Sequence, residues 1–437
     1  MDAATRVAAP APAVRRRMET GRIVVWGAYA LLLIVAPLVF RSSLEQSILT
    51  QIGVAIVACL SYNMLLGQGG MLSFGHAVYT GFASFVAVHA MLGVADGSFA
   101  IPMALVPIVG GFAGMFFAVI LGYVTTKKAG TPFAMITLGL GELVAATVLM
   151  IPEFFGGEGG ISSNRTGGTP FLGITFGPQI QVYYLIAIYA FICTVAMFAF
   201  TRTPLGRMLN AVRDNPERVE FIGYSTQRVR YFSFVIAGFF AGIAGGMYAI
   251  NFEIATAEVV GTARSGAYLL FTFLGGATFF FGPIIGAVLM VVGFALFSEM
   301  TKAWQLYLGL IFLFMVMYAP GGIASLIMMN LRVAAHKKLH RLWGWYAALA
   351  ATAFVMLAGI AALIELVYRL QFGSSGETTL RYLGVTLDSA STFSWLVALA
   401  VAVVGVIAFE VVRRRFAQTW GRIQGEIEAT MTFKEPT

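Results

Sequence analysis

Twelve separate stretches of this chain are apolar enough, and about long enough, to cross a lipid bilayer as helices. Crossing the hydrocarbon core takes about 20 predominantly apolar residues, and every backbone polar group must find a partner there. Only 11% of the 437 residues are charged, against about 25% in a soluble domain. The chain is therefore predicted to be an all-α polytopic membrane protein. The expected spans are 23–40, 47–66, 76–94, 101–126, 131–152, 182–201, 231–250, 264–279, 283–300, 304–319, 343–368 and 392–411.

Lysine and arginine are distributed unevenly between the loops that these spans define. With the N-terminus in the cytoplasm, 22 of the 28 basic residues fall on cytoplasmic segments. Cytoplasmic loops of membrane proteins carry an excess of Lys and Arg, so both termini are expected in the cytoplasm. The net charge of +8 is then a signal of topology, and no nucleic-acid partner is predicted. The six outside residues are Arg41, Arg165, Arg264, Lys302, Arg369 and Arg381.

Three regions follow from this layout. Residues 1–22 are expected to form a cytoplasmic tail, 23–323 a core of about ten spans, and 324–437 a basic loop, an extra two-span hairpin and a cytoplasmic tail. The spans at 264–279 and 283–300 are short and joined by the Gly-rich "GGATFFFGP". A half-membrane hairpin is the alternative for this pair, because broken backbone is tolerated where protein buries it.

Motifs for catalysis are missing from the sequence. There is no Gly-x-x-x-x-Gly-Lys-Ser/Thr phosphate loop, no His-Glu-x-x-His metal pattern and no Gly-x-Ser-x-Gly nucleophile turn. Cys59 and Cys193 both fall inside expected spans. We therefore predict a transport protein with no catalytic residue, no metal site and no cofactor bound by this chain.

One segment, 203–225, is unusually rich in charge for so apolar a chain: "TPLGRMLNAVRDNPERVEFIGYS". Thr203 is suited to cap a helix and Pro204 to begin it, and Asp214-Asn215-Pro216 repeats the device. Gly223 stands where a left-handed residue ends a helix. The segment predicts two short amphipathic helices, which either lie on anionic lipid or dock into the groove of a partner. The apolar stripe of the first helix is Leu205, Met208, Leu209 and Val212.

Polar residues inside two other segments are candidates for a translocation pathway. Glu142 lies near the centre of an expected span, where an ionisable group costs about 2.5–3.5 kcal/mol. It either lines a solute pathway or makes a structural hydrogen bond to a neighbouring span. Residues 67–76, "GQGGMLSFGH", bring Gln68, Ser73 and His76 to a span junction. This junction either lines the pathway near the inner face or is a tight turn that needs glycine for close packing.

Glycines recur at the four-residue spacing that allows transmembrane helices to pack closely. The spacing is a weak signal, because the chain contains 49 glycines. The pairs and triplet concerned are Gly110/Gly114, Gly238/Gly242/Gly246 and Gly282/Gly286.

Several separated stretches resemble LivM-type permeases, which belong to the ABC importers for branched-chain amino acids and related compounds. Residues 205–249, "LGRMLNAVRDNPERVEFIGYSTQRVRYFSFVIAGFFAGIAGGMYA", are similar to the cytoplasmic loop and following span of that family. Residues 60–85 and 130–144, the latter including Glu142, are similar to its second-to-third span junction and its fifth span. Residues 273–287 and 308–323 are similar to its closing spans. The likeness covers about 45–323, and the C-terminal hairpin is not part of it.

The resemblance implies a set of partners. The chain would pair with a second homologous permease in the inner membrane of a bacterial cell, above two ATPase subunits that hydrolyse ATP. A periplasmic solute-binding protein would deliver the solute. The loop 203–225 would dock into a cleft of the ATPase, with Met208 and Leu209 inserting into it. The docking residues would be Leu205, Met208, Leu209, Arg213, Asn215, Glu220 and Gly223.

The resulting hypothesis is a permease subunit that passes branched-chain amino acids or related small organic solutes inward. A sugar-type ABC permease is the nearest alternative. A secondary transporter that works without ATP is another, but it requires ionisable residues within the spans. Only Glu142 and Glu365 meet that requirement.

Overall fold

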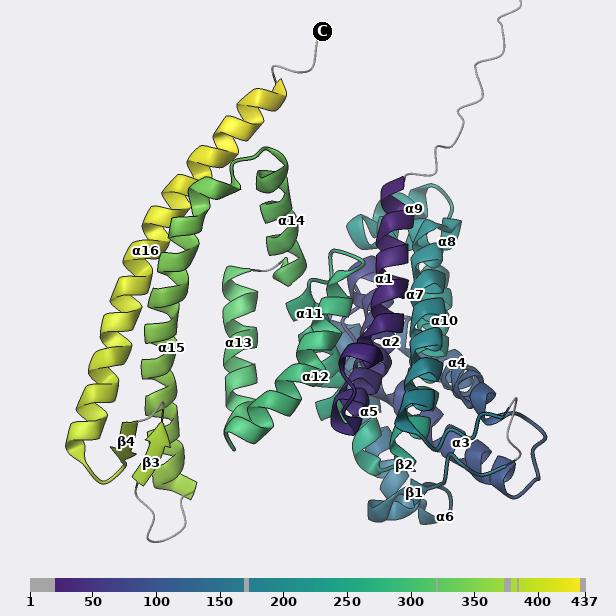
Figure 1. Cartoon of the computed structure of the whole chain (residues 1–437). Helices are drawn as coiled ribbons and strands as arrows, with labels where there is room; N and C mark the ends of the chain where they lie inside the picture. The colour runs from purple at the N-terminus through teal and green to yellow at the C-terminus, as the bar shows by residue number, and fades with distance from the viewer. Residues whose placement is uncertain (1–19, 169–172, 320, 373–378, 383–384, 433–437) are drawn as a thin grey trace, which may run out of the picture. The chain divides into compact units, whose positions relative to one another are not determined.

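The computed structural model describes residues 20–168, 173–319, 321–372, 379–382 and 385–432. Most of the expected N-terminal tail therefore lies outside the described residues. Regular structure in the described part is almost entirely α-helical (Figure 1), which confirms the expected all-α polytopic membrane protein. The chain divides into two compact units, 1–269 and 270–437. This division is by compactness, so the expected boundary at 323/324 stays a prediction.

The first unit contains ten α-helices and the start of an eleventh. Two of its short helices, α8 and α9, occupy the charged segment 203–225, as expected. Its helices are α1 (Thr20–Val39), α2 (Ser43–Gly69), α3 (Ala77–Ala95), α4 (Val106–Thr125), α5 (Thr131–Met150), α6 (Pro152–Phe155), α7 (Gln179–Arg202), α8 (Pro204–Asp214), α9 (Pro216–Phe221), α10 (Thr226–Phe252) and α11 (Thr262–Gly275), with 3-10 turns η1 (Met103–Leu105), η2 (Gly157–Gly159) and η3 (Ala257–Val260) and strands β1 (Ile161–Ser162) and β2 (Ile254–Ala255).

The second unit contains the remaining helices and a short antiparallel strand pair. A helix, α14, occupies much of the basic loop expected after residue 323. The elements are α12 (Gly282–Met300), α13 (Trp304–Tyr318), α14 (Gly322–Ala335), η4 (Leu339–Leu342), α15 (Trp343–Phe372), β3 (Thr379–Tyr382), β4 (Val385–Asp388) and α16 (Thr392–Thr432).

A helix occupies each of the twelve segments expected to span the membrane, but not every helix is long enough. Nine helices in the described residues are long and apolar enough to cross on their own, and α13 with α14 would make a tenth. The apolar part of α1 runs from Ile23 to Val39, and α11 has 14 residues, about 21 Å at the rise of a helix. The count of twelve spans therefore stays a prediction. The length of α11 favours the half-membrane alternative for that segment.

The core of the first unit is built around α2, α3 and α10, which are the most buried of its long helices. Helix α10 packs against α4, α3 and α2. Its contact with α4 uses the glycines singled out in the sequence. A Cβ atom at Gly242 would collide with the carbonyl oxygen of Gly110, and one at Gly246 would lie 2.6 Å from the Cα of Pro107. The two backbones therefore touch, which only glycine at these positions allows.

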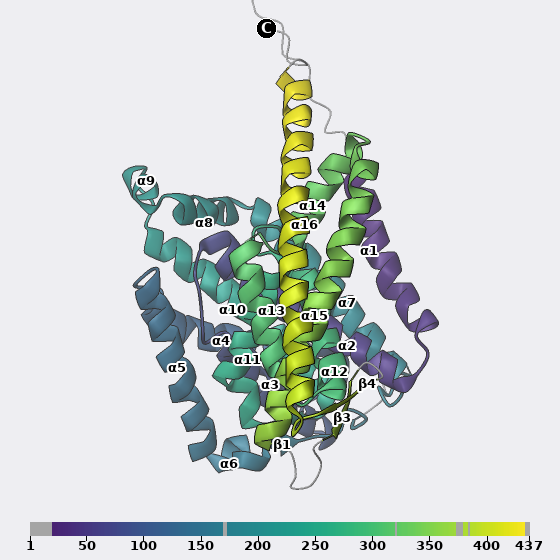
Figure 2. The same ribbon diagram turned by 90° about the vertical axis from the view of Figure 1, so that its left-hand side faces the viewer.

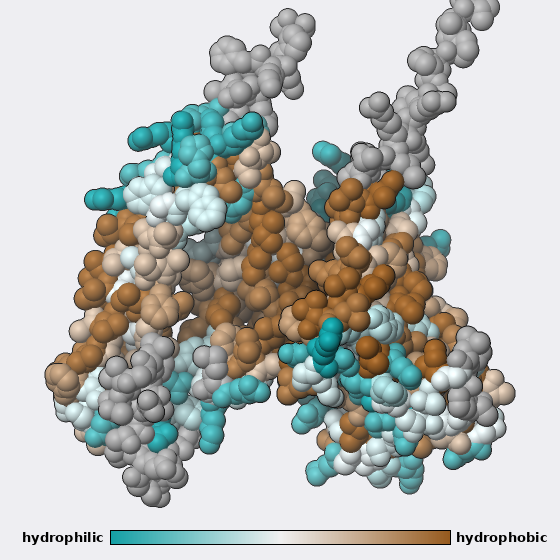
Figure 3. Space-filling model, in the orientation of Figure 1, coloured by the Kyte–Doolittle hydropathy of each residue, from teal (hydrophilic) through white to brown (hydrophobic). Residues whose placement is uncertain are grey.

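The second unit contains a long hairpin of α15 and α16. Gly359 faces the backbone of Ala402, and Gly405 faces the backbone of Met356, where a Cβ would lie 2.5 Å from its Cα. Figure 3 shows hydrophobic residues along the sides of this hairpin and hydrophilic residues gathered near the α14–α15 connection. The basic connection is tied to α16 by Lys338, whose Nζ lies 2.7 Å from a carboxylate oxygen of Glu426.

Glu365, one of the two acids expected inside the membrane, is hydrogen-bonded within the second unit. Its Oε1 accepts from the hydroxyls of Thr301 and Tyr307, the latter at 3.1 Å. Tyr307 belongs to α13 and Glu365 to α15. This carboxyl group therefore links helices of one unit, which is a structural role and gives no support to ion coupling.

The α4–α10 contact predicts a large stability difference between two single-methyl additions. Gly242→Ala forces the helices apart, and overpacking of this kind costs about 1–3 kcal/mol. Gly27→Ala adds the same methyl group where nothing lies within 4 Å. We expect a lower unfolding temperature in detergent for Gly242→Ala only. Equal unfolding temperatures for the two variants would contradict the backbone contact.

Candidate functional site

Helices α8 and α9 follow α7 and precede α10 in the chain, and Figure 2 shows them as a short helical pair above α10. The predicted caps are confirmed. The Thr203 hydroxyl accepts from the Gly206 amide at 3.2 Å, and the Asn215 side chain accepts from the Arg218 amide at 3.0 Å. Gly223 has φ +89°, and the Tyr224 amide donates to the Val219 carbonyl at 3.1 Å. The local sequence therefore sets where each helix begins and ends.

The apolar stripe of α8 does not face outward, which corrects one expectation. Leu209 has no exposed surface, and Val212 and Val219 are also buried. A Cβ at Gly69 would lie 3.2 Å from Cδ1 of Leu209, so this side chain packs on the end of α2. Leu209 is thus part of the core of this chain and is not free to insert into a partner. Leu205 and Met208 are half-buried.

The exposed apolar side chains of the segment lie at the end of α9 and in the turn that follows. Phe221 is 87% exposed, Ile222 66% and Tyr224 53%. They flank Gly223, whose left-handed backbone sets the direction of the turn. We call Phe221, Ile222 and Tyr224 the α9 apolar patch. The patch was not expected from the sequence, although three large apolar residues within four positions of a polar segment are a usable signal.

Arg213 and Glu220, two expected docking residues, make contacts inside the chain. The Arg213 guanidinium donates to the carbonyl of Gly67 and pairs with Asp214 at 2.9 Å. Gly67 lies at the C-terminal end of α2, where unpaired carbonyls attract cations. The Glu220 carboxylate accepts from the Thr226 hydroxyl at 2.8 Å. Arg213 therefore holds α8 to α2, while Glu220 holds α9 to the start of α10.

The junction after α2 is non-helical from Gly70 to His76, and hydroxyl groups satisfy much of its backbone. Tyr62 donates to the carbonyl of Ser73 at 2.9 Å, and the amide of Phe74 donates to Thr137 at 3.1 Å. A Cβ at Gly70 would lie 2.8 Å from Cγ of Arg213, and one at Gly75 would lie 2.5 Å from the carbonyl oxygen of Thr137. The junction is thus packed between α8 and α5.

Ser73 and His76, two expected pathway residues, have no exposed surface in this structure. The His76 ring shares a hydrogen bond of 2.9 Å with the Ser61 hydroxyl. Gln68 is half-buried. Within the described residues, His76 Nδ1 and the Ser73 hydroxyl have no hydrogen-bond partner, which is uncommon for buried polar atoms. A pathway role for Ser73 or His76 requires the junction to open.

Glu142 lies on the exposed face of α5. Its Oε1 accepts from the hydroxyl of Thr262, at the start of α11, at 2.9 Å. No Lys or Arg of the described part of the chain pairs with it. An ionisable group at mid-span on an exposed surface cannot face hydrocarbon without a large cost. Protein or water must therefore cover this face of α5.

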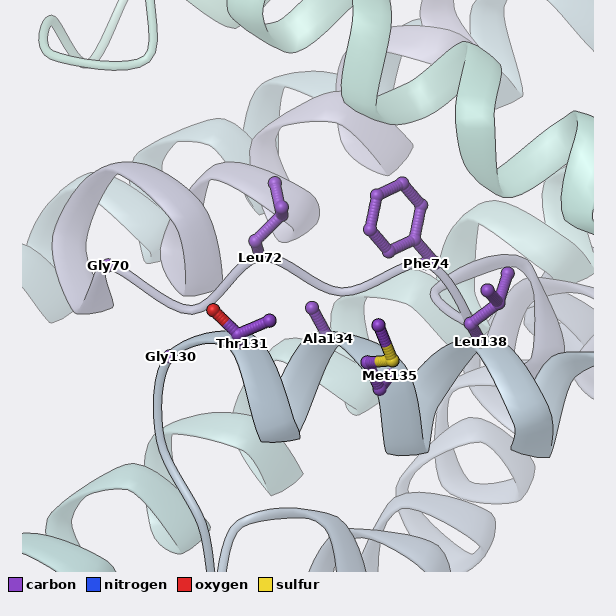
Figure 4. A pocket seen from close by; sticks show the side chains of 8 residues that line it. All are labelled: Gly70, Leu72, Phe74, Gly130, Thr131, Ala134, Met135 and Leu138. Carbon is purple, nitrogen blue, oxygen red and sulfur yellow. The ribbon is translucent and has the colours of Figure 1, made fainter.

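A cavity of about 260 Å³ lies between the junction and the first turns of α5. Figure 4 shows the stretch from Gly70 to Phe74 running beside α5, with Met135 and Leu138 on the facing helix. Met135 is largely exposed, so the cavity is open on its side. The lining is mostly apolar and consists of Gly70, Leu72, Phe74, Gly130, Thr131, Ala134, Met135 and Leu138.

Known proteins are similar to most of the chain. Residues 46–320 match the family described as the permease component of branched-chain amino acid transport systems. The permease protein LivM of a high-affinity branched-chain amino acid transport system in Salmonella typhimurium is 28% identical over 320 residues, covering 68% of this chain and 73% of that protein. Its namesake in Escherichia coli is 27% identical with the same coverage.

A shorter match links the chain to a nucleoside system. The guanosine ABC transporter permease protein NupQ of Bacillus subtilis is 30% identical over 83 residues, which is 19% of this chain and 25% of that protein. No solved structure matches the chain. The family match covers more than half of the chain and includes the junction, α5 and the α8–α9 segment. The chain is thus a multi-pass membrane protein that belongs to the family of branched-chain amino acid transport system permease components.

Proposed function

We propose that this chain is the permease subunit of an ATP-driven importer that passes branched-chain amino acids inward across a bacterial inner membrane. Both termini lie in the cytoplasm, as the distribution of basic residues favours. The chain works with a second homologous permease, two ATPase subunits that hydrolyse ATP, and a periplasmic solute-binding protein. It binds no cofactor itself. The family match over 46–320 is the observation that carries this proposal.

The α8–α9 segment is the docking element for an ATPase subunit. The buried stripe of α8 fixes the segment to the permease, and the α9 apolar patch remains available for a partner. Phe221 is 87% exposed beside several charged residues, and aromatic anchors with a polar rim are typical of binding interfaces. The docking role thus moves from Met208 and Leu209 to Phe221, Ile222 and Tyr224.

Arg213 and Leu209 connect this docking element to the interior. Both contact the end of α2, immediately before the non-helical junction. A displacement of α8 is therefore passed to residues 70–76, which also contact α5. This connection gives a route by which closure of the ATPase reaches the pathway.

The exposed face of α5 lines that pathway. Glu142 requires water or protein against it, and a second permease subunit that faces α5 across a wet pathway supplies both. The secondary-transporter alternative loses support, because Glu365 is hydrogen-bonded to two hydroxyls within its own unit. Gln68 lies at the same end of α2 as the junction, near the cytoplasmic end of the pathway.

The α9 apolar patch predicts loss of the ATPase when it is made polar. We expect Phe221→Ser/Ile222→Ser permease to fold normally, because neither side chain is buried, and to lose most of the co-purifying ATPase. Burying one such side chain is worth roughly 1.5–3 kcal/mol. Leu331→Ser, at another exposed leucine, is the matched control and should retain the ATPase. Full retention by the double variant would refute docking through the patch.

Substitution of Gly223 is predicted to weaken the coupling of ATP hydrolysis to uptake when the new residue does not tolerate a positive φ. Nothing lies within 4 Å of a Cβ placed there, so only its φ of +89° restricts the residue. Valine is strained at positive φ, whereas asparagine tolerates it. In proteoliposomes we expect Gly223→Val to hydrolyse ATP with reduced uptake, and Gly223→Asn to transport nearly as the wild type. Equal transport by both variants would exclude a role for the turn geometry.

Glu142→Gln tests the face of α5. The amide keeps the volume and the hydrogen bond with Thr262, so the complex should assemble and its ATPase should still respond to the binding protein. We expect the uptake rate to fall by about tenfold, the effect of roughly 1.4 kcal/mol on a barrier. An unchanged uptake rate would leave Glu142 with a structural role only.

A further inference from the structure

The cavity beside α5 and the carboxyl group of Glu142 lie close together. Leu138 lines the cavity, and Glu142 follows it by four residues, which places the two residues on one helix face with their Cβ atoms about 5–6 Å apart. A Cβ at Gly141 would lie 3.5 Å from Cγ2 of Thr262 and 3.8 Å from the carbonyl oxygen of Phe74. The cavity wall at Phe74 therefore adjoins Thr262, the hydrogen-bond partner of Glu142.

The two features differ in chemistry. Leu72, Phe74, Met135 and Leu138 give the cavity an apolar surface, which favours an aliphatic group because burial of each CH₂ group away from water is favourable. Glu142 offers an acceptor whose only partner in the described residues is the Thr262 hydroxyl. A carboxylate in this setting favours a cation that donates hydrogen bonds.

We propose that the cavity and Glu142 together form a binding site for the transported solute, with the cavity holding an aliphatic side chain and Glu142 holding the ammonium group. Both features lie on one face of α5, so one small amino acid can contact them together. The site rests on the proposed import function and specifies the class of solute.

Other occupants fit the site less well. A sugar or nucleoside has no ammonium group for Glu142 and would place hydroxyls against an apolar wall. A lipid acyl chain suits the cavity but gives the carboxyl group no partner. Only a solute that is both aliphatic and cationic at one end uses both features. The observed chemistry thus favours an amino acid over the sugar-type alternative.

The experiment measures uptake of leucine and valine by the full complex, with its ATPases and binding protein, in liposomes. Leu138→Phe narrows the cavity, so leucine uptake should fall about tenfold relative to valine, the discrimination that one methylene group can carry. Leu138→Ala widens the cavity and should shift the ratio toward leucine. Leu32→Phe, at an exposed leucine on α1 outside the cavity, is the matched control and should keep the wild-type ratio.

The ammonium group is tested separately with 2-hydroxy-4-methylpentanoate, in which a hydroxyl replaces the amino group of leucine. Wild-type complex should prefer leucine, and Glu142→Gln should reduce that preference by about tenfold, as expected when a charge-assisted hydrogen bond is lost. Co-purification of all subunits and ATP hydrolysis stimulated by the binding protein establish that each variant is assembled.

Each outcome has a distinct meaning. Wild-type complex that imports neither leucine nor valine would refute the proposed function. Wild-type import combined with an unchanged leucine-to-valine ratio in both Leu138 variants would overturn the site and leave the proposed function intact. Equal loss of both solutes in Leu138→Phe, with an unchanged preference in Glu142→Gln, would assign the cavity to lipid and also overturn the site.

Discussion

A lipid bilayer offers no hydrogen-bond partners, so a backbone that leaves the helical conformation inside it needs other groups of the protein. The junction from Gly70 to His76 meets this requirement with hydroxyls from three helices. Tyr62 of α2, Thr137 of α5 and Ser265 of α11 bond to the backbone of Ser73, Phe74 and Ala77. These bonds attach α2, α5 and α11 to the junction and to the start of α3. The path of the junction, and with it one wall of the cavity beside α5, depends on them.

The fold also requires that helix backbones approach closely at a few positions. Glycine is needed there because it has no Cβ atom. At Gly110 and Gly242 the two helix backbones touch, while at Gly70 the junction makes room for the Arg213 side chain. The first contact holds α4 to α10 and is a matter of stability. The second lies on the route from the α8–α9 segment to the junction. A glycine-rich sequence thus serves packing in one place and the connection between sites in another.

The two intramembrane acids show how one chemical group serves two purposes. Glu365 accepts hydrogen bonds from Thr301 and Tyr307 and joins elements of the second unit. Glu142 has one hydroxyl partner and remains exposed on α5. Because hydrocarbon cannot solvate such a group, the face that carries Glu142 must meet protein or water in the assembled transporter. The difference in surroundings, and not the residue type, separates the structural acid from the functional candidate.

The sequence by itself predicted a helix in each of the twelve apolar segments, and the two short helices at 203–225 with their caps, because hydropathy and capping depend on neighbouring residues. It also pointed to the glycine spacings and to Glu142.

The sequence did not determine which side of α8 faces the protein. An amphipathic stripe predicts burial but does not say whether the chain or a partner covers it, and the structure places Leu209 against α2. The α9 apolar patch, the link from Arg213 to Gly67, and the cavity one turn from Glu142 all join residues distant in sequence. Only tertiary packing decided them, since contacts between separate helices depend on how the helices cross, which no local pattern records.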